Sequence, residues 1–178
     1  VKGTKIIVFY PKNGVSPIQE KQMVTQKGEN TSVVAIHGNF DNAQSGVKAI
    51  FEDKELAAEL DAKGYQFSSA NSINIGRLVP QVVYYVYAYA KMYANGEVAK
   101  GEKINVVVPT GNFGNILAAY YAKNMGVPID KLICASNDNK VLYDFFRTGT
   151  YDRNREFILT TSPSMDILIS SNLERLIY

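Results

Sequence analysis

The residues best suited to bind a ligand lie between Val106 and Asn115, in the order Val-Val-Val-Pro-Thr-Gly-Asn-Phe-Gly-Asn. Three β-branched residues are typical of a buried strand, Gly111 and Gly114 bracket a tight turn, and the apolar run that follows predicts a helix. Glycines allow backbone N–H groups to approach an anion closely, and the first turn of a helix adds unpaired N–H groups. The sequence therefore predicts a phosphate site, with Asn112 and Asn115 as further donors. An ordinary strand-to-helix turn is the structural alternative.

The spacing of this loop narrows the kind of phosphate. It matches neither the Gly-x-Gly-x-x-Gly pattern of dinucleotide sites nor the P-loop, because no Gly-Lys-Ser/Thr follows it. This favours the phosphate of a small cofactor over NAD or ATP.

Strands and helices are expected to alternate along the whole chain. Apolar runs predict strands over 5–10, 32–36, 104–108 and 131–135, with helical segments between them. This order predicts an α/β protein, a three-layer αβα arrangement with mainly parallel sheets. Ligands of such sheets bind at the carboxyl ends of the strands. Polar loops rich in Asn, Ser and Gly follow the strands there, at 38–41, 68–77, 110–115 and 136–139.

Capping signals predict several helix starts. Ser16 followed by Pro17 and Gln19 forms a capping box with proline at the first helical position. We expect Asp41 to cap the next helix, and Ser171 to open a capping box that Glu174 closes.

The segment 77–95 is expected to be one long helix. It is apolar over most of its circumference, which predicts burial on several sides. Tyr85, Tyr89 and Tyr93 form a stripe along it, and we interpret them as packing residues whose hydroxyls reach the edge of the core.

Composition excludes several classes of function. The 178 residues carry a net charge of only +2 with no basic cluster, which argues against nucleic-acid binding. The most apolar run is interrupted by Pro80 and Lys91, which argues against a membrane span. His37 and Cys134 are single in the chain, so a His-rich metal site and a disulfide framework are excluded. We interpret His37 as a structural or solvent-facing residue rather than a catalytic one, and Cys134 as a small core residue. One cysteine fits a reducing, cytoplasmic compartment.

Several motifs, taken together and in order, resemble the threonine synthase family of pyridoxal-phosphate (PLP) enzymes. Residues 109–115 look like its cofactor-phosphate loop, and similar segments lie at 38–41, 71–78, 162–168 and 170–175. The resemblance covers essentially the whole chain. It implies fold type II, the tryptophan-synthase-β type, and conversion of O-phospho-L-homoserine and water to L-threonine and phosphate.

The resemblance also implies site residues. Backbone amides would hold the cofactor phosphate at Gly111, Asn112, Phe113, Gly114 and Asn115. The substrate side would be lined by Asn71, Ser72, Asn74 and Arg77. Arg77 is a candidate for an anionic group of the substrate, because a guanidinium matches carboxylate or phosphate bidentately. Pairing of Arg77 at the start of the helix is the structural alternative.

Two family segments have no counterpart here. The Phe-Lys-Asp-like segment of the Schiff-base lysine is absent, and so is a Ser-Gly-Asp-Thr-Gly-like loop. We therefore expect an internal fragment with no catalytic residue of its own, inactive alone. Residues 1–76 would end the smaller domain of such an enzyme, and residues 77–178 would begin the larger one.

Two other functions compete with this hypothesis. One is another fold type II lyase, of the threonine dehydratase or cysteine synthase type, from which the segment 71–77 differs. The other is a non-enzymatic phosphate-binding module of the flavodoxin or response-regulator kind. A receiver needs an acidic pair at the end of its first strand, where Tyr10 and Pro11 stand.

Overall fold

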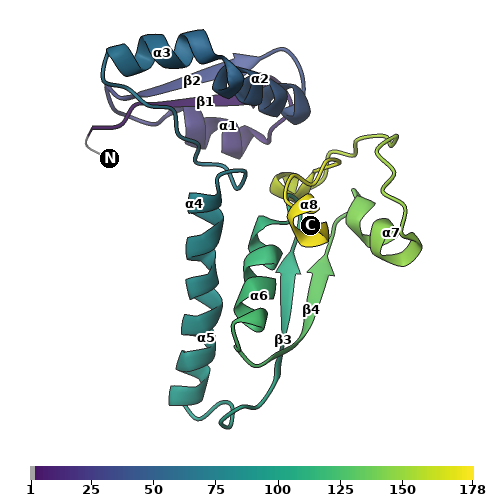
Figure 1. Ribbon diagram of the computed structural model, residues 1–178. Coiled ribbons are helices and arrows are strands. Elements are labelled where there is room, and N and C mark those ends of the chain that lie inside the picture. Colours follow the sequence, from purple (N-terminus) through teal and green to yellow (C-terminus); the bar gives the residue numbers. More distant parts are fainter. Residues whose placement is uncertain (1–2) are drawn as a thin grey trace. The chain divides into compact units, whose positions relative to one another are not determined.

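The computed structural model describes residues 3–178 as an α/β protein with short parallel sheets, as the sequence predicts. The chain forms two compact units, Val1–Phe67 and Ser68–Tyr178 (Figure 1). Along the chain, the boundary between the two units falls between Phe67 and Ser68, whereas the sequence predicts a domain boundary after residue 76. The assignment of enzyme domains stays a prediction.

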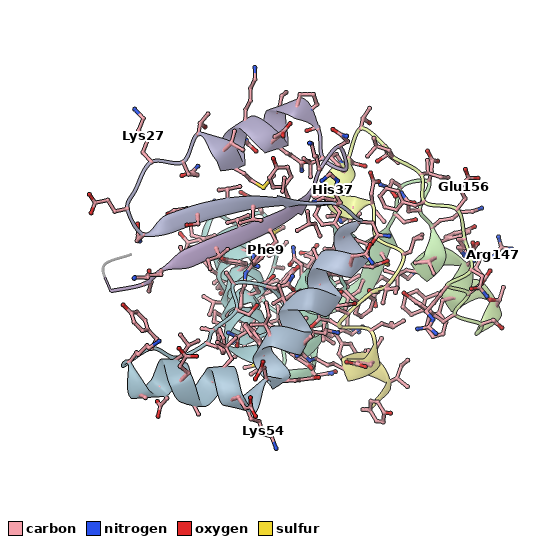
Figure 2. All side chains as sticks on the ribbon, turned by 90° about the horizontal axis from the view of Figure 1, so that it is seen from above. Phe9, Lys27, His37, Lys54, Arg147 and Glu156 are labelled. Carbon is pink, nitrogen blue, oxygen red and sulfur yellow. The ribbon has the colours of Figure 1, made fainter. Side chains whose placement is uncertain are left out.

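The first unit is a strand–helix–strand motif followed by two helices. β1 (Ile6–Pro11) pairs in parallel with β2 (Thr31–Ile36), and α1 (Pro17–Val24) connects them. Two further helices follow, α2 (Phe40–Glu52) and α3 (Lys54–Ala62). Figures 1 and 2 show α1 on one face of the sheet, and α2 and α3 on the other.

The helix starts of this unit test the capping predictions. The Ser16 side chain accepts the N–H of Gln19 and the Gln19 side chain accepts the N–H of Ser16, which confirms the first capping box. The prediction for Asp41 is wrong. Asn39 caps α2 in a reciprocal pair with Asn42, with both distances 2.9 Å, because its amide reaches the N–H three residues on.

The second unit contains the remaining elements. They are α4 (Ile75–Leu78), the 3₁₀ turn η1 (Val79–Gln81), α5 (Val82–Ala94), β3 (Ile104–Pro109), α6 (Gly114–Asn124), β4 (Ile129–Ala135), α7 (Val141–Thr148), the 3₁₀ turn η2 (Pro163–Met165) and α8 (Glu174–Ile177). β3 and β4 pair directly and in parallel, and α6 connects them along the chain. α6 lies between this sheet and α5 (Figure 1).

The core of this unit surrounds α6. Leu117, Ala118, Ala119 and Ala122 are fully buried, because small side chains let α6 sit close to both α5 and the sheet. The N-terminus of α6 is thereby held rigidly at the carboxyl end of β3.

The single helix expected over 77–95 is interrupted. Pro80 lacks a backbone N–H and disfavours the helical conformation of the residue before it, and the chain passes through η1 between α4 and α5. The expected burial of α5 is also wrong. Val82 is its one buried residue within the described chain, while Val83, Tyr84 and Tyr87 are each more than 60% exposed.

The tyrosine hydroxyls of α5 bond as expected at the edge of the core. Tyr85 donates to Asn115 and Tyr89 to the carbonyl of Glu102. No helix within residues 3–178 has both the length and the apolar character that a membrane crossing needs.

Candidate functional site

The loop between β3 and α6 presents a row of backbone N–H groups with no internal partner. Thr110 closes the strand, since its N–H donates to the carbonyl of Ala135 at 2.8 Å and its hydroxyl to that of Val108 at 2.7 Å. From Gly111 to Asn115, no N–H group donates to an acceptor within the described part of the chain. Five successive donors at the start of an 11-residue helix, on the positive end of its dipole, form an arrangement suited to an anion.

Phe113 has a strained backbone at the centre of this loop. Its φ of 67° lies in the left-handed region, where a bulky residue is uncommon. The ring is 5% exposed, belongs to the main core cluster, and packs on Phe146 with ring centroids 6.1 Å apart. The ring therefore holds the turn in place. α6 has no side-chain cap, which leaves its first-turn N–H groups open to a ligand.

Both glycines of the loop are needed for close packing. A Cβ atom on Gly114 would lie 2.8 Å from Cβ of Ser72, and one on Gly111 would lie 2.8 Å from Cγ1 of Ile167. Neither glycine has positive φ. Gly111 and Gly114 thus allow two other segments to pack against the loop.

In the polar segment 69–77, Ser72 packs against the loop 111–115. It packs on Gly114 and its hydroxyl accepts a 2.9 Å hydrogen bond from Asn172, which also bonds to Asn112. The structure therefore brings Ser72 and the loop together.

The other three predicted substrate residues bond within their own segment. The Asn71 carboxamide oxygen accepts the N–H of Ile73, and the side chain of Asn74 caps α4 while donating to the carbonyl of Ser69. Arg77 is exposed, and its guanidinium donates to the carbonyl of Ala70. This bond orders the polar segment.

Three residues that our sequence reasoning gave no role complete the site. Ser170 donates its hydroxyl to the carbonyl of Gly111 at 2.8 Å, fully buried Asn172 bonds to Asn112, and Arg175 donates to the carbonyls of Ser72 and Ile73. Their partners lie about 60 to 100 residues earlier in the chain, so no local pattern could reveal them. The sequence shows the segment 170–175 only as a stretch that resembles the threonine synthase family, without roles for its side chains.

The capping box predicted for Ser171 and Glu174 is absent. α8 begins at Glu174 without a side-chain cap, and the Ser171 hydroxyl instead lies 3.5 Å from the Asn112 carboxamide oxygen. Packing against the loop 111–115 overrides the local preference for a capping box.

Burial favours the neutral form of two titratable side chains in this unit. Burial raises the pKa of the Tyr85 hydroxyl, which therefore stays a neutral donor to Asn115. Burial also raises the pKa of the Cys134 thiol, which agrees with a structural role. In the second polar loop, Asn137 and Asn139 donate to the buried carboxylate of Asp166 at 2.7 and 2.9 Å.

Other reactive side chains lie away from this loop or in solvent. His37 directly follows β2 and is exposed, as expected (Figure 2). Every described lysine is exposed except Lys123, which donates to the carbonyl of Asp130. Within residues 3–178, no group of three His, Cys, Asp or Glu side chains could hold a metal ion.

Comparison with known proteins supports the resemblance seen in the sequence. The chain is 45% identical to threonine synthase of Saccharomyces cerevisiae over 177 residues, which is 99% of this chain, and 51% identical to human threonine synthase-like 1 over 172 residues, which is 96% of it. The chain is homologous to the threonine synthases. The crystal structure of PLP-bound threonine synthase from Brucella melitensis matches with a TM-score of 0.77 and 44% identity over 99% of this chain.

The chain is shorter than these threonine synthases. It spans 33% of the yeast protein, 23% of the human one and 36% of the Brucella chain. No family model matches the sequence. The structural neighbours establish the fold type II class and argue against a flavodoxin-like module.

Proposed function

We propose that this chain carries the cofactor-phosphate site of a PLP-dependent threonine synthase. The observation that carries the proposal is the run of five N–H groups, Gly111 to Asn115, without internal acceptors. An unpaired N–H is unfavourable inside a protein, so a consecutive row of them is suited to a ligand that accepts hydrogen bonds. A phosphate offers three oxygens and a negative charge. The Brucella relative of the same fold is described as PLP-bound.

The residues around the loop fit a phosphate group. The carbonyls of Gly111 and Asn112 are occupied by Ser170 and Asn172, so the loop presents donors rather than acceptors. No carboxylate is hydrogen-bonded to residues 111–115 within the described part of the chain. The N-terminal end of a helix contributes about 0.3–1 kcal/mol to the binding of an anion.

In the whole protein, we propose the reaction O-phospho-L-homoserine plus water to L-threonine plus phosphate. PLP, when bound, supplies an electron sink for charge that develops on substrate carbon atoms. This chain would hold the cofactor's phosphate with the amides of 111–115 and form part of the substrate side with Asn71, Ser72, Asn74 and Arg77. Arg77 can offer the substrate its remaining donors, because Nη1 alone bonds to Ala70.

We further propose that the chain by itself carries out no turnover. The described lysines are exposed or, for Lys123, bonded to a carbonyl of its own unit, and none of them is hydrogen-bonded to residues 111–115. The phosphate site and the covalent attachment would then belong to different segments of the protein.

A phosphate titration followed by amide NMR tests the site. We expect inorganic phosphate and PLP to shift the signals of Gly111 to Asn115 most strongly, with sulfate as a competing anion. If these signals stay fixed while lysine-rich surfaces respond, the proposed function is wrong.

Borohydride reduction tests the covalent part. The chain is mixed with PLP, reduced and digested, and the modified lysines are identified by mass spectrometry. We expect low, scattered modification of exposed lysines such as Lys27 and Lys54, which extend away from the ribbon (Figure 2). Stoichiometric modification of one lysine would contradict the proposal.

A further inference from the structure

We propose that Ser170, Asn172 and Arg175 form a latch that aims the N–H groups of the phosphate loop and couples that loop to the segment 69–74. They are positioning residues, since each acts through the backbone of another segment. The inference depends on the proposed function only for the identity of the ligand.

The first step of the argument concerns the peptide planes of the loop. In a trans peptide, the carbonyl of one residue and the N–H of the next point in opposite directions, and no cis bond occurs in the described chain. Ser170 holds the carbonyl of Gly111 at 2.8 Å. The N–H of Asn112 is therefore directed away from Ser170.

Asn172 fixes the next peptide plane in the same way. Its backbone N–H and its carboxamide both donate to the carbonyl of Asn112, at 3.1 and 2.9 Å. The N–H of Phe113 is accordingly directed to the opposite side. With both carbonyls held by hydrogen bonds, the N–H groups of Asn112 and Phe113 are each oriented before any ligand binds.

The second step concerns the coupling. The Asn172 carboxamide also donates to the Ser72 hydroxyl at 2.9 Å, and its oxygen accepts Nη1 of Arg175 at 2.5 Å. The Arg175 guanidinium in turn donates to the carbonyls of Ser72 and Ile73, at 3.0 and 2.6 Å. A single fully buried asparagine thus bonds simultaneously to the phosphate loop and to the segment that carries the candidate substrate residues.

The charge of Arg175 adds to this arrangement. The guanidinium donates three hydrogen bonds, all to neutral oxygens, and it makes no ion pair with a carboxylate within residues 3–178. A half-buried guanidinium without an acidic partner leaves a net positive charge beside Asn172, the residue that bonds to Asn112 of the loop. The latch therefore orders the loop and favours an anion at the same time.

The test measures inorganic phosphate binding by amide NMR in the full chain. Ser170→Ala removes the hydroxyl that holds the Gly111 carbonyl, and Asn172→Leu removes the carboxamide but keeps the backbone N–H at the Asn112 carbonyl. We expect the dissociation constant at the loop to rise about tenfold in each. Ser170→Thr keeps the hydroxyl and should bind within about twofold of the parent. Arg155→Met is the matched control, because it removes an ion pair in the same unit that does not touch the loop.

Coupling is read from the segment 69–74 in the same titration. In the parent chain, phosphate should shift the amides of Ser72 and Ile73, and in Arg175→Met this response should be lost while the loop still binds phosphate. A merely structural role predicts instead that loss of binding follows loss of stability in every variant, Arg155→Met included.

The latch also has a test that needs no ligand. Without phosphate, Ser170→Ala should move the Asn112 signal and Asn172→Leu the Phe113 signal, whereas Arg155→Met should leave both unchanged. If the parent binds no phosphate but these signals move, the latch holds and the proposed function fails. If the folded variants leave both the signals and phosphate binding unchanged, the latch is wrong.

Discussion

Phe113 occupies a backbone conformation that favours glycine, yet its ring is part of the core. The strain of a left-handed turn, about 1–2 kcal/mol for a residue with a Cβ atom, is offset by burial of the ring. The buried Phe113 ring thereby fixes the shape of the loop 111–115, while Gly111 and Gly114 leave room for neighbouring segments. Local strain at a functional site, stabilised by surrounding packing, is a recurring arrangement in proteins.

This strain leads to a prediction about the order of two variants. Phe113→Ala should lower the free energy of unfolding by about 3–5 kcal/mol, because it leaves a cavity in the core. Phe113→Gly should be more stable than Phe113→Ala by about 0.5–1 kcal/mol, because glycine adopts positive φ without a steric penalty. Denaturant unfolding measures both values.

A control position lies in α6, the helix that Phe113 directly precedes. At Tyr120, which is partly exposed on α6, the usual order should hold and the alanine variant should be more stable than the glycine variant. If glycine is worse than alanine at both positions, the left-handed turn does not govern stability at Phe113.

Gly114 provides a second prediction at the level of single residues. In Gly114→Ala, the new methyl group would meet Ser72 at 2.8 Å, and one of the two segments must shift. We expect destabilisation of about 1–3 kcal/mol and weaker phosphate binding, measured by thermal unfolding and by the phosphate titration. Retention of both would show that the segment 69–74 yields without affecting the loop.

At the scale of elements, α2 carries a glycine with no packing role. Gly46 lies inside this helix with ordinary φ, and a Cβ atom there would meet nothing within 4 Å. Gly46→Ala should therefore stabilise the first unit by about 0.5–1 kcal/mol, measured as a higher denaturant midpoint. Destabilisation would mean that the helix needs flexibility at this position.

The ion pair between α7 and the following segment predicts an acid dependence. Asp144 accepts from Nη1 of Arg155 at 2.5 Å, and this hydrogen bond, together with the nearby charges of Lys140 and Arg147, holds the pKa of the Asp144 carboxyl below its ordinary value of 3.8. A lowered pKa means that the folded chain favours the ionised form. The stabilising contribution is therefore present above pH 3.8 and is lost as the pH falls toward the lower pKa of the folded state.

Arg155→Met removes the cause of this shift. Denaturant unfolding at a series of acidic pH values should show a smaller loss of stability on acidification in the variant than in the parent. Equal slopes would show that the pair contributes nothing to the acid response.

The elements also show what a sequence can and cannot predict. The four strands, the Ser16 capping box and the helix after Gly114 follow from local patterns, because their signals lie within a few residues of one another. Two other features depend on competition between neighbouring side chains for the same hydrogen-bonding groups. Asn39 rather than Asp41 caps α2, and Ser171 contacts Asn112 instead of capping α8. The Asn172 and Arg175 contacts span about 60 to 100 residues, and only the fold brings them together.

At the scale of the whole chain, the two units differ in how well they are packed. Within residues 3–178, the two hydrophobic core clusters lie in the second unit, whereas the helices of the first unit contain no buried residue. Apolar burial is the main favourable term in folding, so the first unit should be the less stable one.

Unfolding should therefore occur in two transitions. We expect the signals of the first unit to be lost at lower denaturant, with Gly46→Ala shifting only that transition and Arg155→Met only the later one. Residue-resolved amide exchange against denaturant makes this measurement. A single coincident transition for both units would contradict the prediction.

The two-stranded sheets have a consequence of their own. In each sheet every strand pairs on one side, so one row of amide and carbonyl groups per strand remains open to a further strand. In solution, the chain by itself should be prone to ordered self-assembly at these open edges, and short strand-blocking peptides should slow it.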